Sequence, residues 1–198
     1  MPSKSEKTTQ YILETVSPIF NKKGYTATSM RDITEATGLT KGAIYGNFES
    51  KEALSLAAFN FNIHYFMGKL KVILTEIDSP LKRLYALTNF YRTDYFQYNL
   101  AYGGCPLLNV GVDANHTNSM LLGRVTEVVM KLKNAISGMI IEGIECKEFR
   151  LNVDPEVYGG RIFSLIEGAI FTSVLLKDEA YLIDMMDHVD KMIKNELE

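Results

Sequence analysis

The chain has 198 residues, of which 46% are hydrophobic and 23% are charged, and its formal net charge is −3. This composition is that of a globular protein large enough to bury a core, and it excludes a disordered chain, a collagen, a disulfide scaffold and a coiled-coil rod. Only five prolines occur, which leaves room for long uninterrupted helices.

The uncharged segment 95–112 is the nearest approach to a membrane-spanning sequence. It carries Gln97, the Gly103-Gly104 pair, Pro106 and two asparagines, and is too polar and too interrupted to cross a bilayer. The polar, amphipathic N-terminal segment does not have the form of a signal peptide. Two widely separated cysteines favour a reducing compartment. We therefore expect a cytoplasmic protein that makes no use of a membrane.

The first quarter of the chain predicts three short helices and the start of a long one. An apolar stripe with helical spacing covers about residues 5–22 and stops at Gly24. Short polar side chains precede the next three apolar segments and can cap their helices: Thr28 or Ser29, Thr40 and Ser50. The second helix ends at Gly38, the third covers about residues 41–47, and the fourth reaches about residue 76.

The remaining helices are longer. Helical spacing, caps and helix-starting prolines predict them at about residues 80–100, 107–113, 115–145, 155–176 and 179–197, with Asn115 or Thr117 as the cap of the third of these. The alternating apolar pattern of a β-strand does not occur. The sequence therefore predicts an all-α protein of about nine helices, with a compact N-terminal head and a larger helical body.

Residues 28–48 have the pattern of a helix-turn-helix. Two short amphipathic helices are joined at Gly38, and the apolar contacts Ile33, Leu39 and Ile44 are spaced to pack them together. The second helix begins Lys41-Gly42-Ala43, and such small side chains let a helix approach base edges in a DNA major groove. Three side chains at or beside it can donate to phosphate oxygens: Lys41, Tyr45 and Lys51.

Charge alone would not suggest a nucleic-acid partner. Residues 1–54 hold seven Lys and Arg against six Asp and Glu, a net +1, whereas the rest of the chain carries −4. A strongly basic protein would attract DNA through its overall field. Here the prediction depends on a few well-placed donors.

The segments 26–33 (TATSMRDI) and 38–54 (GLTKGAIYGNFESKEAL) resemble the DNA-binding head of tetracycline-repressor-like (TetR/AcrR) transcriptional regulators. The resemblance is specific over about residues 8–55 and extends to the rest in architecture alone. It implies a helix-turn-helix DNA-binding domain at residues 1–50 and a ligand-binding and dimerisation domain at 51–198. It also implies a homodimeric repressor that binds a palindromic double-stranded operator and releases it when a small molecule occupies the body.

Matched residue by residue, the resemblance implies base-edge contacts from Lys41, Gly42 and Ala43, and phosphate contacts from Thr28, Tyr45 and Lys51. The full expected DNA-binding set adds the two helix caps and one further donor: Ser29, Thr40 and Asn47. The chain departs from the family pattern where Gly46 and Asn47 replace an aromatic residue and a histidine. Asn47 can still donate a hydrogen bond, whereas Gly46 removes one expected phosphate contact.

The aromatic residues of the body offer either a ligand pocket or an ordinary core. The residues that we expect to bind an apolar or aromatic effector are Phe66, Tyr91, Tyr95, Cys105 and Asn109. Cys105 could instead be a reactive thiol that senses oxidants or electrophiles, or simply a small buried apolar residue. The segment 95–115 around it contains no Lys or Arg to lower the thiol pKa, which favours burial.

The predicted helix 157–176 is apolar nearly all round and therefore has to be covered on two sides. The protein's own core can cover one side and a partner subunit the other, with a twofold four-helix interface formed together with the last helix. The residues expected in this dimer interface are Ile162, Ile166, Ile170, Met185, Val189 and Met192. A monomer is the alternative.

Catalytic and metal-binding patterns are not found in the sequence. The three histidines have no metal-ligand spacing, and neither a nucleophile elbow nor a phosphate-binding loop is present. We expect no catalytic residue, metal or cofactor. Two alternatives to a regulator stay open: a helical small-molecule-binding protein without DNA-binding activity, and an α-helical enzyme.

Overall fold

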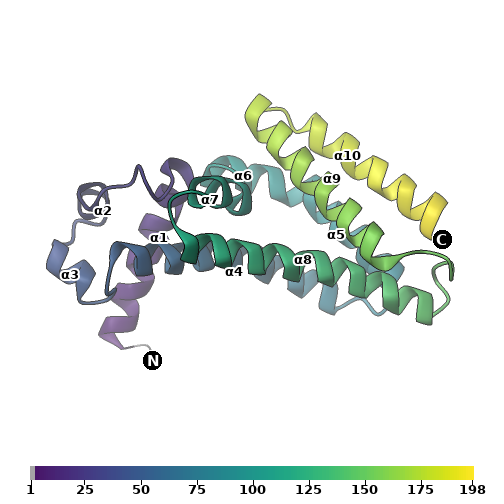
Figure 1. Cartoon of the computed structure of the whole chain (residues 1–198), viewed down its shortest axis with the longest axis horizontal. Helices are drawn as coiled ribbons and strands as arrows, with labels where there is room; N and C mark the ends of the chain where they lie inside the picture. Colours follow the sequence, from purple (N-terminus) through teal and green to yellow (C-terminus); the bar gives the residue numbers. More distant parts are fainter. Residues whose placement is uncertain (1–2) are drawn as a thin grey trace. The chain divides into compact units, whose positions relative to one another are not determined.

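The computed structural model describes residues 3–198, with the side chains of all of these except Gln97, Leu100 and Ala101. Within this range the chain is helical and has no strand (Figure 1). The elements, in chain order, are α1 (Lys4–Lys23), α2 (Met30–Thr37), α3 (Lys41–Tyr45), α4 (Lys51–Thr75), α5 (Pro80–Phe90), η1 (Tyr91–Tyr95), α6 (Phe96–Tyr102), α7 (Pro106–Ala114), α8 (Ser119–Glu145), α9 (Pro155–Leu176), α10 (Ala180–Met192) and η2 (Ile193–Leu197). The predicted all-α fold is confirmed.

The chain forms two compact units. The head unit extends to Phe66 and includes Tyr102–Thr126, and the body unit comprises Met67–Ala101 and Glu127–Glu198. The long helices α4 and α8 each begin in the head unit and end in the body unit. The head unit therefore contains α7 in addition to the helices of the predicted DNA-binding domain.

Besides the last helix, which ends in the π-helical turn η2, two predicted helices differ from the observed ones in detail. The segment 80–100 is not one regular helix, because a π-helical turn, η1, separates α5 from α6 and carries the buried Tyr91 and Tyr95. The start of α8 is capped by neither of the predicted residues. Instead the Asn118 side chain accepts a hydrogen bond from the Leu121 amide at 2.9 Å. Both differences arise within a single turn, where spacing patterns have least resolving power.

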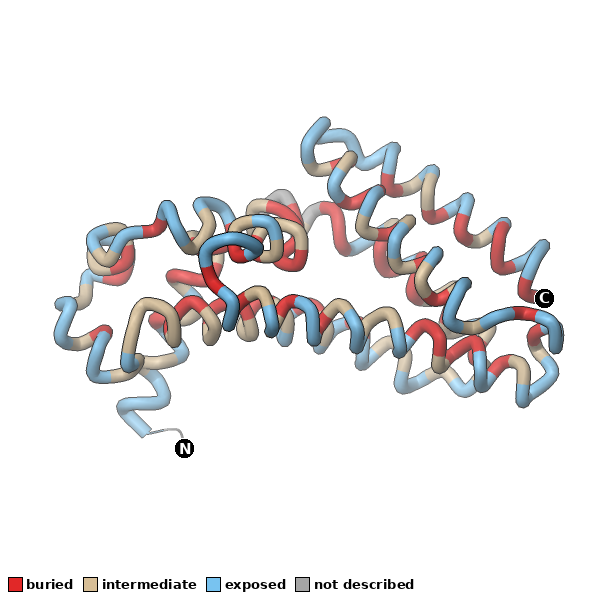
Figure 2. The backbone as a smooth tube through the Cα atoms, viewed as in Figure 1, coloured by how far each residue is buried: buried red, intermediate tan, exposed pale blue. Residues whose placement is uncertain are grey.

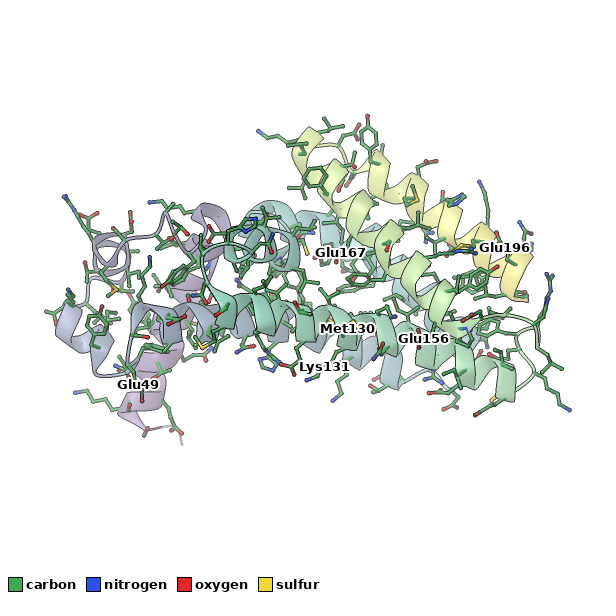
Figure 3. The ribbon with its side chains drawn as sticks, in the orientation of Figure 1. Glu49, Met130, Lys131, Glu156, Glu167 and Glu196 are labelled. Atoms are coloured by element: carbon green, nitrogen blue, oxygen red, sulfur yellow. The ribbon has the colours of Figure 1, made fainter. Side chains whose placement is uncertain are left out.

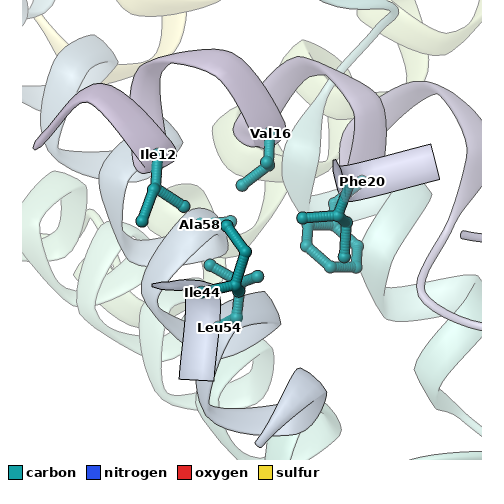
Figure 4. Packing of buried hydrophobic residues seen from close by; sticks show 7 residues of the cluster. Ile12, Val16, Phe20, Ile44, Leu54 and Ala58 are labelled. Carbon is teal, nitrogen blue, oxygen red and sulfur yellow. The ribbon is translucent and has the colours of Figure 1, made fainter. Parts of the chain in front are cut away.

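A small apolar core holds the head together. Ile12, Val16 and Phe20 of α1 face Ile44 of α3 together with Leu54 and Ala58 of α4 (Figure 4). The side chain of Ile33 from α2 completes this core and is fully buried. Because α3 contributes a single buried side chain to it, the rest of that short helix is left for the surface.

In the body unit, α9 and α10 lie side by side, and buried and exposed positions alternate along both (Figure 2). Polar contacts tie the end of the chain to this unit. Tyr158 of α9 donates at 2.8 Å to Glu196, which is labelled in Figure 3, and Arg92 of η1 donates to Asp190 of α10 at 2.5 Å. By length and composition α9 is also apolar enough to cross a membrane, a test that core helices of soluble proteins pass as well.

Candidate functional site

The two helices of the predicted helix-turn-helix are fixed by local hydrogen bonds. At the start of α2, the Ser29 hydroxyl accepts from the Asp32 amide at 3.1 Å, and the Asp32 carboxylate accepts from the Ser29 amide at 2.7 Å. Gly38 ends α2 in the left-handed conformation with φ +67°. Thr40 then caps α3, because its hydroxyl accepts from the Ala43 amide at 3.1 Å. The sequence predicted Gly38 and Thr40 in these places, and for the first cap it offered Ser29 and Thr28 as alternatives.

The face of α3 that is turned to solvent carries most of the residues expected to reach DNA. Thr40, Lys41, Gly42 and Tyr45 are exposed, and Ala43 is half-buried. The Lys41 ammonium lies 5.7 Å from the centre of the Tyr45 ring. A side chain added at Gly42 would approach the Thr40 hydroxyl to 3.9 Å and would meet no closer atom beyond the helix backbone. Gly42 and Ala43 therefore leave a stretch of α3 without long side chains between the two donors Lys41 and Tyr45.

Thr28 lies differently from the sequence-based expectation. Its side chain is fully buried, and its hydroxyl donates to the Gly24 carbonyl at 2.7 Å. The resemblance implied a phosphate contact from Thr28 at the start of α2, but the Thr28 hydroxyl instead closes the turn between α1 and α2. Asn47 is half-buried and bonded on both sides, since its amide donates to the Ala43 carbonyl and its oxygen accepts from Thr9.

Lys51 is half-buried at the start of α4. Its ammonium donates to the Tyr25 carbonyl at 2.7 Å and lies 4.3 Å from the centre of the Tyr25 ring. Burial lowers the pKa of Lys51, while the negative charges of Asp113 and Asp32 act against that change. The Lys51 ammonium is therefore fixed in position by its contacts with Tyr25.

Asp32 is the most strongly perturbed carboxyl group on this surface. Hydrogen bonds from Lys23, at 2.7 Å, and from Ser29 hold its pKa well below the ordinary value. The pairing neutralises a negative charge close to α2, which favours the approach of a polyanion.

The body unit contains an open cavity of about 680 Å³. This volume falls within the range of about 300–1,000 Å³ found for small-molecule sites. Its apolar lining comes from α4, the segment that follows it, α5, α8 and α9: Met67, Leu70, Leu74, Ile77, Leu87, Leu132, Ala135, Ile136, Met139, Phe163 and Ile166. The polar lining residues are Lys71, Thr75, Asp78, Arg83, Tyr91 and Glu142. The cavity thus combines an apolar wall with a few polar groups.

Arg83 is the most informative of these polar groups. Its guanidinium pairs with the Glu142 carboxylate and donates to the Asp78 carbonyl at 3.3 Å. Its Nε atom is buried and has no hydrogen-bond partner among the described residues. A buried N–H group without a partner is costly unless water or a ligand accepts from it.

Of the five residues predicted to bind an effector, Tyr91 lines this cavity. Tyr95 is buried in the same π-helical turn but is not among the described lining residues. Phe66, Cys105 and Asn109 belong to the head unit. Asn109 donates to the carbonyls of Asn21 and Gly103, so its amide serves to fix α7. Cys105 is buried, as the sequence favoured, and Cys146 is exposed.

The residues predicted for a dimer interface lie mostly inside the protomer. Five of the six are buried, and Met185 is half-buried: the buried ones are Ile162, Ile166, Ile170, Val189 and Met192. A different stripe of α9 faces solvent, with residues spaced alternately four and three apart: Val157, Arg161, Ser164, Gly168, Phe171 and Leu175. Phe171 and Leu175 are 55% and 65% exposed. This spacing is that of a helix seam that packs against another helix.

The sequence did not predict most of the residues that line the cavity. They come from separate segments, and the spacing of apolar residues along a helix does not tell which of its faces borders an empty space. Asp113 of α7 was not predicted either, and it accepts hydrogen bonds from two backbone amides of the turn between α1 and α2. Among residues 3–198, no group of three or more His, Cys, Asp or Glu side chains is placed to hold a metal ion.

Comparison with known proteins gives matches along most of the chain. The family described as bacterial regulatory proteins, tetR family, matches residues 12–58, and the tetracyclin repressor-like C-terminal domain matches residues 80–189. A TetR-family regulator of Cytophaga hutchinsonii is 35% identical with a TM-score of 0.89, covering 98% of this chain and 96% of its own. A TetR regulator of Chloroflexus aurantiacus is 31% identical with a TM-score of 0.92, covering 98% of both chains. The HTH-type transcriptional repressor DhaR of a Mycobacterium species is 24% identical over 162 residues, which are 81% of this chain and 79% of that protein.

Proposed function

Since this chain belongs to the tetR family of bacterial regulatory proteins and is a DNA-binding transcriptional regulator, we propose that it acts as a homodimeric, cytoplasmic repressor released by a small molecule. The single observation that carries the ligand response is the cavity of about 680 Å³ in the body unit. Regulation rather than catalysis is the activity of the family, and we propose no reaction for this chain.

The proposed operator contacts are the exposed donors and small residues around α3. Lys41, Gly42 and Ala43 face base edges, while Tyr45 and Lys51 reach phosphates, as the resemblance implied. Ser29 and Thr40 are the N-caps of α2 and α3, and we include their hydroxyls and the backbone amides of the two helix N-termini in the proposed DNA-binding surface. Asn47, which follows α3, stays among the proposed DNA-binding residues as a hydrogen-bond donor. The burial of Thr28 argues against a direct contact from its side chain.

The proposed effector is a small, mainly apolar molecule that carries one hydrogen-bond acceptor. The apolar wall would cover its body, and the Nε–H of Arg83 would donate to its oxygen. Because Arg83 is already paired with Glu142, a neutral carbonyl fits this end better than a carboxylate, which would face the negative charge of Glu142. The effector would release the operator by favouring a state with lower DNA affinity.

Two glycines of α8 allow a direct test of this cavity. Gly138 lines it and has no side-chain or backbone atom of another segment within 4 Å of the place where a side chain would begin. Gly138→Leu should therefore project into the cavity and occupy part of it. The probes are methyl decanoate, decanoic acid and decylamine, tested for release of a duplex that the wild-type protein selects from random-sequence DNA.

We expect methyl decanoate to release the duplex from the wild-type protein more effectively than the acid or the amine, and Gly138→Leu to bind the duplex but resist release. Gly123→Leu, an equally open and exposed position on α8, is the control and should respond as the wild type does. Equal response of Gly138→Leu and the wild type would rule out this cavity as the effector site.

The proposed dimer uses the exposed stripe of α9. Two such stripes related by a twofold axis would bury Phe171 and Leu175, while the buried residues Ile162, Ile166 and Ile170 would support the interface from the opposite face. Phe171→Glu should place a charge within the interface and yield a protein of monomer mass in light scattering. Dimer mass for Phe171→Glu at micromolar concentration would contradict this arrangement.

A further inference from the structure

The carboxylate of Asp113, on α7, reaches the turn between α1 and α2. Its Oδ2 atom accepts from the Tyr25 amide at 2.5 Å and from the Thr26 amide at 3.2 Å. The fit is close, because a side chain at Gly24 would begin 3.1 Å from the Asp113 carboxyl group. Gly24 also has φ +82°, which other residues rarely adopt. The turn is therefore shaped around this carboxylate.

The same peptide unit is bound from its other side by Lys51. The Thr26 amide of the Tyr25–Thr26 peptide donates to Asp113 at 3.2 Å, and the Tyr25 carbonyl of the same peptide accepts from the Lys51 ammonium at 2.7 Å. A lysine ammonium has three N–H donors, of which this carbonyl uses one. Fixing the Tyr25 peptide thus fixes the place from which the ammonium can donate to a phosphate.

Asp113 approaches this turn from a firmly anchored helix. The Asn109 amide of α7 donates to the Asn21 carbonyl at 3.0 Å, and the buried Asn21 amide donates to the carbonyls of Tyr102 and Gly104, each at 2.8 Å. These bonds join α7 and the segment before it to the C-terminal end of α1. The position of the Asp113 carboxylate is accordingly fixed by hydrogen bonds within the head unit.

We propose that Asp113 is a positioning residue for operator binding, which acts by fixing the Tyr25 peptide and through it the Lys51 ammonium. This inference rests on the proposed phosphate contact of Lys51. Asp113 lies outside residues 12–58, the part matched by the family's DNA-binding domain. The head unit therefore needs α7 as a structural part of its DNA-binding surface.

A double-mutant cycle tests the pathway through Lys51. The probe is the duplex that the wild-type protein selects from random-sequence DNA, with affinity measured at a temperature where circular dichroism shows every variant folded. Asp113→Ala should weaken binding about tenfold, within the range for directly coupled neighbours. In the Lys51→Ala background it should have almost no further effect. Both single variants should reduce the slope of log affinity against log salt by about two, because each removes one phosphate contact from each half-site of the dimer's operator.

Two further variants separate positioning from stability. Asp113→Asn retains an acceptor oxygen at the same reach and should keep most of the affinity, whereas Asp113→Glu keeps the charge but is too long for the space beside Gly24 and should lose it. Glu145→Ala, which removes an exposed carboxylate at the end of α8, should bind as the wild type does. If Asp113→Ala does not fold, the cycle is run with Asp113→Glu.

The cycle has outcomes that overturn the inference. Losses from Asp113→Ala and Lys51→Ala that multiply in the double variant would show that Asp113 does not act through Lys51. Unchanged operator affinity of Asp113→Ala would show that Asp113 is not a positioning residue. If Lys51→Ala alone binds as tightly as the wild type, the phosphate contact is wrong and the inference falls with it, while operator binding by the wild-type protein stands.

Discussion

The head and the body units differ in how their sequence determines their structure. In the head, the boundaries of α2 are set by short-range signals, namely the mutual bonds of Ser29 and Asp32 and the left-handed Gly38. In the body, the cavity is bordered by separate segments, and its lining residues are ordinary apolar side chains that would serve equally well in a core. Local chemistry can therefore be read from one segment, whereas an empty space between segments cannot.

The largest expected effects concern the separate cores of the two units. Ile33 and Ile162 are both fully buried, and truncating either to alanine should cost about 2–5 kcal/mol of unfolding free energy. Hydrogen exchange should show the difference between the units. We expect Ile33→Ala to accelerate exchange in α1–α3 and Ile162→Ala to accelerate it in α9 and α10. Equal acceleration everywhere in both variants would mean that the two units unfold as one.

A second test addresses the surface of α3 without altering its core. Gly42→Leu meets no close atom within the protein, so it should fold normally and yet keep the helix away from base edges. We expect operator affinity to fall about 100-fold, since a lost base contact costs about 1–3 kcal/mol in each half-site. Gly123→Leu, on α8, serves as the matched control in the mobility-shift titration. Retained affinity would contradict our placement of the base contacts.

A third test concerns close packing in the body. A side chain at Gly159 of α9 would begin 3.0 Å from the backbone nitrogen of Ser137, whereas one at the neighbouring Gly160 has open space. Gly159→Ala should therefore lower stability by about 1–3 kcal/mol through overpacking. Gly160→Ala should raise it slightly, because alanine favours helix. Urea denaturation measures both, and equal effects would contradict this packing.

The smallest expected effect is the pH dependence of the α2 cap. The pKa of Asp32 is lowered on folding, first by its bond to Lys23, so its ionised form stabilises the head above the unfolded value of about 4 and this contribution is lost as the pH falls further. Asp32→Asn should melt at a lower temperature than the wild type at pH 7, and the gap should narrow below pH 4. A gap that does not change between pH 7 and pH 3 would show that the charge of Asp32 is unimportant.

Much of the head could be predicted because capping requires particular residues at particular places. Thr40 and Gly38 could be assigned from sequence alone, and the structure places them as caps. Thr28 shows the limit of such reasoning. A polar residue before a helix looks exposed in sequence, but its hydroxyl finds the Gly24 carbonyl and is buried there. The DNA contacts themselves stay predictions until measured.

The dimer surface shows a similar limit. The helix 157–176 is apolar on nearly every face, so the sequence could state that it needs covering on two sides but could not tell which residues face which side. The structure assigns Ile162 and Ile166 to the protomer's interior and leaves Phe171 and Leu175 exposed. Asp113 could not have been found from sequence, because 87 residues separate it from Thr26, to whose amide it is bonded.

The unequal burial of the two cysteines has a practical consequence. Cys146 is exposed directly after the last residue of α8, and Cys105 is almost fully enclosed. A maleimide spin label should attach to the first thiol and spare the second, without any engineered mutation. Each subunit of a pair would then carry one label, and pulsed electron paramagnetic resonance would report directly how far the two labels move when a ligand is added.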